Sequence, residues 1–173
     1  MERSEKKRLC FPPAAPADMR ILILGSFPGQ YSLQKGQYYA HPRNVFWRIM
    51  GEAFSFDCEI DYRERIAIVN SHRIGIWDVL QSCRRYGSLD SKIETATIVP
   101  NDFIHFFDCY SQLRLIVFNG SRAETEFKKR ILPKLGGIEK RIEMIRMPST
   151  SPAMATMSYQ EKYKVWSGIR KYL

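Results

Sequence analysis

Short, nearly continuous apolar runs alternate along the chain with stretches in which apolar residues recur at helical spacing. Two longer runs lie at residues 19–24 and 113–118, and two shorter candidates lie at residues 74–77 and 142–147. Such a run is typical of a strand that is buried on both faces, as in a parallel sheet. We therefore predict a strand in each run, with Gly25 and Asn119-Gly120 closing the two longer ones.

Helices are predicted between these strands. Apolar residues recur every three or four positions in three segments, which contain Phe46, Ile49, Met50 and Ala53; Phe103, Phe106, Phe107 and Tyr110; and Tyr159, Tyr163, Trp166 and Ile169. Ser121-Arg-Ala-Glu124 and Ser158-Tyr-Gln-Glu161 each match the capping box that starts a helix. We interpret the aromatic face of the last segment as core rather than as a base-stacking platform. Strands alternating with helices predict a three-layer α/β/α sandwich, whose functional residues gather in loops at the carboxyl ends of the strands.

The first residues differ in composition from the rest of the chain. Residues 1–18 are charged and then rich in Pro and Ala, which is typical of a loose tail or an extended wrap, and residues 19–173 fit one domain. No apolar run approaches the ~18 residues of a membrane helix, and none follows the charged start as a secretory signal would. We therefore expect a monomeric cytoplasmic protein.

Net charge points to a polyanionic partner. The 27 Lys and Arg residues against 18 acidic residues leave a net charge of +9. Such a domain suits DNA, because phosphate contacts release counterions, although a soluble basic protein is an equal alternative on charge alone. The four cysteines are widely spaced and are expected to be reduced thiols, and the three histidines lack ligand spacing, so we expect no metal or cofactor.

Two loops carry unusual sequences. Gly25-Ser-Phe-Pro-Gly29 follows the first strand without the Gly-Lys-Ser/Thr end of a nucleotide-binding loop, and an aromatic segment leads from it to Asn44. Asn44 is either functional or an N-cap for the next helix. The second loop, Met147-Pro-Ser-Thr-Ser-Pro-Ala153, presents three hydroxyls between prolines, which suits a DNA phosphate or an ordinary turn equally well.

Together these blocks resemble a known family. Gly25-Ser-Phe-Pro-Gly29, Tyr39-Ala-His-Pro-Arg-Asn44 and Pro148-Ser-Thr-Ser-Pro152, in this order, are similar to the uracil-DNA glycosylase superfamily, and particularly to its hypoxanthine-DNA (deoxyinosine) glycosylase branch. The resemblance implies a four-stranded, mostly parallel sheet between helices, and hydrolysis of a deaminated base from DNA to leave an abasic site. Such enzymes extrude the base from the stack into a pocket. The base would be hypoxanthine, with uracil and xanthine as alternatives.

One departure from the superfamily decides the expected catalytic residue. Phe27 stands where most members have the Asp, Asn or Glu that handles the attacking water. The resemblance implies that Asn44 takes this role through its amide oxygen. Since an amide is a poor base, most of the rate would come from stabilising the cationic sugar and the departing base. Ser149 stands where uracil-removing members have a histidine, which leaves His41 as the candidate imidazole near the leaving group.

The same resemblance assigns the remaining site residues. Ser26 and Phe27 are expected in the base pocket, Phe46 is expected to stack on the base, and Asp78 to accept a hydrogen bond from its edge. Phe46 could instead pack in the core. Asp78 could instead be the N-cap of a helix that contains Val79. The expected DNA contacts are Gly25, Pro28, Gly29, His41, Arg43, Ser149, Thr150 and Ser151, with Met154 as an apolar wedge.

Two other functions compete with a glycosylase. One is a catalytically weak protein of the same fold that binds DNA lesions, because Phe27 cannot polarise water. The other is an unrelated α/β enzyme acting on a small molecule, which the absence of a nucleotide-binding motif disfavours. Cleavage of lesion-containing duplexes separates the first from the glycosylase.

Overall fold

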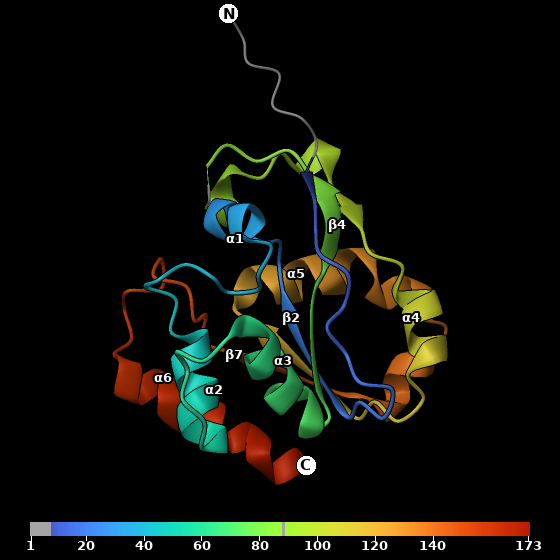
Figure 1. The fold of residues 1–173 in the computed structure, drawn as a ribbon. Helices are drawn as coiled ribbons and strands as arrows, with labels where there is room; N and C mark the ends of the chain where they lie inside the picture. Colours follow the sequence, from blue (N-terminus) through green and yellow to red (C-terminus); the bar gives the residue numbers. More distant parts are fainter. Residues whose placement is uncertain (1–7, 88) are drawn as a thin grey trace, which may run out of the picture.

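The central sheet has the predicted parallel arrangement. A computed structural model describes residues 8–87 and 89–173 of the chain. Four strands, β2 (Ile21–Gly25), β3 (Ile74–Asp78), β6 (Leu115–Asn119) and β7 (Glu143–Met147), lie in the order β3-β2-β6-β7. Every neighbouring pair is parallel, so all four carboxyl ends lie at one edge of the sheet (Figure 1). The predicted α/β fold with a four-stranded sheet is confirmed.

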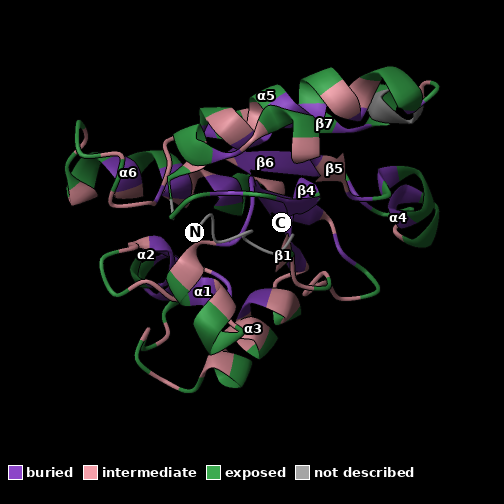
Figure 2. Ribbon diagram, turned by 90° about the horizontal axis from the view of Figure 1, so that it is seen from above, coloured by how far each residue is buried: buried purple, intermediate pink, exposed green. Residues whose placement is uncertain are grey.

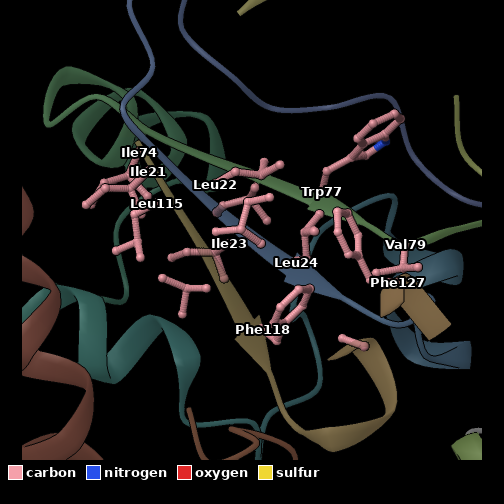
Figure 3. Packing of buried hydrophobic residues seen from close by; sticks show 14 of the residues in the cluster. Ile21, Leu22, Ile23, Leu24, Ile74, Trp77, Val79, Leu115, Phe118 and Phe127 are labelled. Atoms are coloured by element: carbon pink, nitrogen blue, oxygen red, sulfur yellow. The ribbon is translucent and has the colours of Figure 1, made fainter. Parts of the chain in front are cut away.

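Helices cover both faces of this sheet. Helix α5 (Ser121–Arg130) lies on one side and α3 (Tyr62–Ser71) on the other, with the buried strand β6 between them (Figure 2). The side chains of β2 are fully buried, which explains why this strand has no polar face. Figure 3 shows Phe118 of β6 and Phe127 of α5 in the same core, where their ring centroids are 5.3 Å apart.

The other helices complete the two outer layers. They are α1 (Gln30–Lys35), α2 (Phe46–Phe54), α4 (Phe103–Cys109) and α6 (Tyr159–Trp166), and the 3₁₀ turns are η1 (Asp90–Lys92), η2 (Thr95–Thr97), η3 (Leu132–Lys134), η4 (Ile138–Arg141) and η5 (Ser167–Tyr172). The capping box predicted at Ser158 is present. The one predicted at Ser121 is wrong, because Gly120 is the N-cap and Glu124 binds Lys128 and Arg146 instead. No helix in the described ranges is long and apolar enough to cross a membrane.

A second, antiparallel sheet was not predicted. It consists of β1 (Arg8–Leu9), β4 (Leu80–Cys83) and β5 (Val99–Pro100), in the order β1-β4-β5. Of the predicted tail 1–18, residues 1–7 lie outside the described residues, and the remainder runs along the domain. Phe11 accepts a hydrogen bond from the Trp77 indole at 3.2 Å, and Ala14 pairs with Ile76. Ala14 therefore pairs with the outer edge of β3, which is an edge strand of the parallel sheet.

Candidate active site

One pocket opens where the parallel strands end. Gly25 of β2 is in register with Asp78 of β3, and Asn119 of β6 with Met147 of β7. The pocket has a volume of about 620 Å³. It brings together all the predicted site residues except Phe46, namely Gly25, Ser26, Phe27, Pro28, Gly29, His41, Arg43, Asn44, Asp78, Ser149, Thr150, Ser151 and Met154. Its position follows the general rule for ligand sites in open parallel sheets.

The glycine at the end of β2 creates the floor of the pocket. A Cβ atom on Gly25 would overlap Oδ1 of Asp78 and would lie 3.3 Å from the hydroxyl of Tyr39. Since no other residue lacks this atom, glycine is required here for the two polar side chains to converge.

Asp78 is a buried acid with an unused hydrogen-bonding atom. Its side chain is 3% exposed, and its Oδ2 has no hydrogen-bond partner among the described residues. Burial, reinforced by the charge of Asp90 and partly offset by Arg85, raises the pKa of Asp78 to about 8. The carboxyl group is therefore mostly protonated at neutral pH. The alternative of a helix N-cap is wrong, because Val79 leads directly into strand β4.

Tyr39, rather than Phe46, presents an aromatic ring to the pocket. Phe46 is fully buried and does not line the pocket, which corrects its predicted contact with the base and agrees with the core alternative. The Tyr39 ring stacks on it with a centroid distance of 4.0 Å. The Tyr39 hydroxyl is buried, and burial and the Asp78 charge raise its pKa, an effect that the Asn119 side chain partly offsets. Tyr39 is the first residue of the block Tyr39-Ala-His-Pro-Arg-Asn44. An aromatic side chain so close in sequence to the glycine loop was the signal that could have predicted its place in the pocket.

Asn44 is not the N-cap that the sequence offered as an alternative, but its side chain contacts the start of helix α2 and it also lines the pocket. Its Oδ1 accepts a hydrogen bond of 3.0 Å from the backbone N–H of Phe46, the first residue of α2. The formal N-cap is Val45, so Asn44 acts one residue earlier, in an Asx-type turn. A carbonyl oxygen has two lone pairs, so the Phe46 N–H leaves one of them unused.

An ion pair between the buried Arg85 and the partly exposed Asp90 supports the first loop. Arg85, 5% exposed, donates hydrogen bonds to the backbone carbonyls of Phe27 and Pro28, and its guanidinium lies 5.2 Å from the centroid of the Phe27 ring. Asp90 lies 3.7 Å from this guanidinium and accepts a hydrogen bond of 2.6 Å from the Ser26 hydroxyl. The predicted pocket residues Ser26 and Phe27 are thus fixed by residues of a distant loop. The sequence held no local signal for this link.

The closing loop is anchored to β6 through Thr150. Asn119 Oδ1 accepts from the Thr150 backbone N–H, and Asn119 Nδ2 donates to its hydroxyl, both at 2.9 Å. Thr150 is 1% exposed, so its hydroxyl is a structural anchor and not the predicted phosphate contact. Ser149 and Ser151 are partly exposed, and their hydroxyls accept hydrogen bonds from backbone N–H groups of the same loop.

The C-terminal helix holds the same loop at two points. The Trp166 indole donates to the carbonyl of Pro148 at 2.9 Å, and the Lys162 ammonium donates to the carbonyl of Met154 at 2.7 Å. Lys162 is 5% exposed, and burial lowers its pKa. Met154 itself is partly exposed at the rim of the pocket.

Cationic and imidazole groups complete the rim. Arg43 is exposed, and its backbone N–H donates to Nδ1 of His41 at 3.1 Å. Arg122, which the sequence did not single out, also lines the pocket and pairs with Glu126 at 3.0 Å. The rim therefore combines positive charge with the half-exposed Met154, an arrangement suited to a nucleic acid.

Comparisons with known proteins agree with this geometry. Residues 12–170 match the Uracil DNA glycosylase superfamily. A hypoxanthine DNA glycosylase of Methanosarcina barkeri is 40% identical over 118 residues, which cover 68% of this chain and 73% of that protein. One from Methanosarcina acetivorans is 37% identical over 145 residues, covering 79% of this chain and 90% of that protein. The solution NMR structure of a candidate uracil DNA glycosylase from M. acetivorans has a TM-score of 0.78 at 35% sequence identity, covering 95% of this chain and 96% of that chain.

The family match includes every loop that contributes to the pocket, from Gly25 to Met154. It confirms the resemblance and the enzyme class predicted from the sequence, a hydrolase that acts on N-glycosyl bonds. The structural match covers almost the whole fold. The chain belongs to the uracil-DNA glycosylase superfamily.

Proposed function

We propose that this protein removes hypoxanthine from DNA by extruding the nucleotide into the pocket and hydrolysing its N-glycosidic bond. The observation that carries the proposal is the convergence of Asp78, Tyr39 and Asn44 in one pocket at the strand ends. The names of the two Methanosarcina relatives support hypoxanthine as the base. The volume of about 620 Å³ is in the range of roughly 300–1,000 Å³ that small ligands occupy.

The protonated carboxyl of Asp78 is suited to the edge of hypoxanthine. A neutral carboxyl group offers one O–H donor beside one carbonyl acceptor. Hypoxanthine presents the complementary pair, the O6 acceptor beside the N1–H donor, and uracil presents an equivalent edge. A neutral carboxyl can also match the amino donor and ring acceptor of adenine. Discrimination against adenine would therefore rest on extrusion, since a mismatched base costs less to remove from the duplex.

The aromatic floor of the pocket is assigned to Tyr39. Phe46 stacks on one face of its ring, and Tyr39 lines the pocket whereas Phe46 does not. A base stacked there would continue a pile of three aromatic rings, with offset geometry favourable to π-systems. The buried hydroxyl of Tyr39 lies near the carboxyl of Asp78, so it adds a second polar group for the base.

Asn44 is proposed to hold the attacking water with the lone pair that the Phe46 N–H leaves free. The water would attack the anomeric carbon as the bond to the base breaks, the electrons of that bond would leave with the base, and the proton released by the water would pass to the departing base, directly or through solvent. Because an amide removes a proton poorly, the main contribution of the site is electrostatic and positional. This predicts slow turnover compared with enzymes that use a carboxylate.

The test uses duplexes that each contain one hypoxanthine, uracil or xanthine, followed by alkaline cleavage of abasic sites. We expect strand breaks with hypoxanthine at a higher rate than with the other two bases. Breaks with uracil alone would overturn the choice of hypoxanthine and keep the enzyme class. Selective binding to the lesions without breaks would favour the lesion-binding alternative, which the buried, apolar Phe27 at the usual catalytic position supports.

A further inference from the structure

The loop between β4 and η2 forms part of the pocket rim that the proposed reaction does not use. The two arms of this loop run antiparallel. Arg85 forms a β-bridge with Ile93, and the backbone N–H of Glu94 donates a hydrogen bond to the carbonyl of Arg84. Leu89 in this loop lines the pocket, although its side chain is 52% exposed. A single exposed leucine is ordinary on a protein surface, but this one lies in the lining of the pocket, where a ligand held in the pocket would cover it.

Two anchors fix the loop on either side of its tip. Arg85 donates to the Phe27 and Pro28 carbonyls, and Asp90, the neighbour of Leu89, accepts from Ser26. The Arg85 side chain also donates to the Gly87 carbonyl at 3.1 Å, so it contacts the same turn of which it is part. Arg85 and Asp90, on either side of Leu89 in the sequence, therefore both attach the loop to residues 26–28.

The surroundings of Leu89 favour DNA as the partner. Arg84 and Lys92 are exposed on the same loop, and Arg43 and Arg122 lie on the pocket rim. Exposed cations around an apolar tip match a duplex, in which phosphates flank stacked bases. In Figure 1 this yellow-green loop lies at the top of the molecule, and the orange-red loop 148–157 that carries Met154 lies at the left, so the two reach the pocket from different sides.

We propose that Leu89 is a second apolar contact to DNA, which packs against bases beside the extruded nucleotide from the side of the pocket away from Met154. This inference rests on the proposed function. Two supports on different sides would hold the duplex open while the base is in the pocket.

The test compares Leu89→Ala with Ile104→Ala, a control of similar exposure (47%) on helix α4, away from this pocket. Single-turnover excision is measured on a hypoxanthine duplex and on the same strand alone. We expect Leu89→Ala to lower the duplex rate about tenfold and to leave the single-strand rate within about twofold, because only the duplex must be unstacked. Ile104→Ala should match the wild type on both substrates.

A second measurement does not depend on cleavage. The fluorescence of 2-aminopurine placed next to hypoxanthine rises when the stack opens, so the wild type should raise it and Leu89→Ala should raise it less. A normal fluorescence response together with an unchanged duplex rate would overturn the proposal. An equal loss on both substrates with a lower melting temperature would also overturn it, by assigning Leu89 to the stability of the loop. A wild type that opens the stack without cleaving would instead contradict the proposed function.

Discussion

The ring of Tyr39, which lines the pocket, stacks on the ring of Phe46, which does not, with 28° between their planes and with the ring centroids 4.0 Å apart. Truncating the two rings should therefore have different effects. Tyr39→Ala should weaken binding of lesion DNA by about tenfold or more, the size of one lost base–aromatic contact. Phe46→Ala should instead lower the free energy of unfolding by about 3–5 kcal/mol, as for a fully buried phenylalanine.

Tyr39→Phe is the matched control, because it keeps the ring and removes only the hydroxyl. It should retain the stacking contribution that Tyr39→Ala loses and show only the smaller loss of affinity that comes from the missing hydroxyl, as measured by fluorescence anisotropy. If Tyr39→Ala bound DNA normally, the base would not stack on this ring.

Asn44 combines a helix-start contact with a proposed catalytic role, and two substitutions separate them. Asn44→Ala should lower the single-turnover rate by about 10²-fold and stability by about 1 kcal/mol. Asn44→Ser keeps a capping oxygen but shortens the side chain, so stability should recover while the rate stays low. Recovery of the rate with serine would reduce Asn44 to a structural residue.

The pKa of Asp78 makes a prediction about stability and pH. Burial raises this pKa from 3.8 to about 8, so the folded protein retains a proton that the unfolded chain has lost between these values. The free energy of unfolding should therefore fall, relative to Asp78→Asn, as the pH rises from about 5 to about 8, and level off above that. Urea unfolding of both proteins across this range measures the difference. A constant difference would show that Asp78 is ionised throughout.

The basic rim predicts binding that depends on salt. The logarithm of the affinity for DNA should fall with the logarithm of salt concentration, with a slope of about −0.9 for each phosphate contacted. Arg43→Ala should make this slope shallower by about one. Lys129→Ala removes the same charge from the last turn of α5, the end of the helix away from the pocket, and should change the slope little. If the two variants changed the slope equally, the cause would be the net charge of the protein and not a phosphate contact made by Arg43.

Met154 is predicted to act as the wedge that keeps the base out. Met154→Ala should slow excision from stable pairs more than from mispaired or single-stranded lesions, which cost less to unstack. The melting temperature should barely change, since Lys162 holds the loop through the backbone carbonyl of this residue, and the Met154 sulfur only accepts a weak, exposed hydrogen bond from Thr156 of the same loop. A large fall in melting temperature would place the side chain in the core instead.

The sequence predicted the parallel sheet well because its strands are buried on both faces and therefore read as apolar runs. The antiparallel sheet could not be predicted in this way, since β1 and β5 have two residues each and β4 follows β3 after Val79 alone. Within the site, short blocks identified the pocket walls. Phe46 was assigned to the base because sequence spacing does not reveal that the Tyr39 ring covers it. Likewise, 57 positions separate Arg85 from Pro28, a contact that only the folded chain creates.

The two hydrogen bonds from helix α6 to the carbonyls of Pro148 and Met154 affect the entropy of binding. A loop that is ordered only on contact with DNA loses backbone and side-chain freedom at that step, which weakens the affinity. Here Trp166 and Lys162 restrict the loop before any ligand arrives, so that loss is already included in the folding free energy. The packing of helix α6 against the closing loop therefore contributes to the affinity of the pocket for DNA.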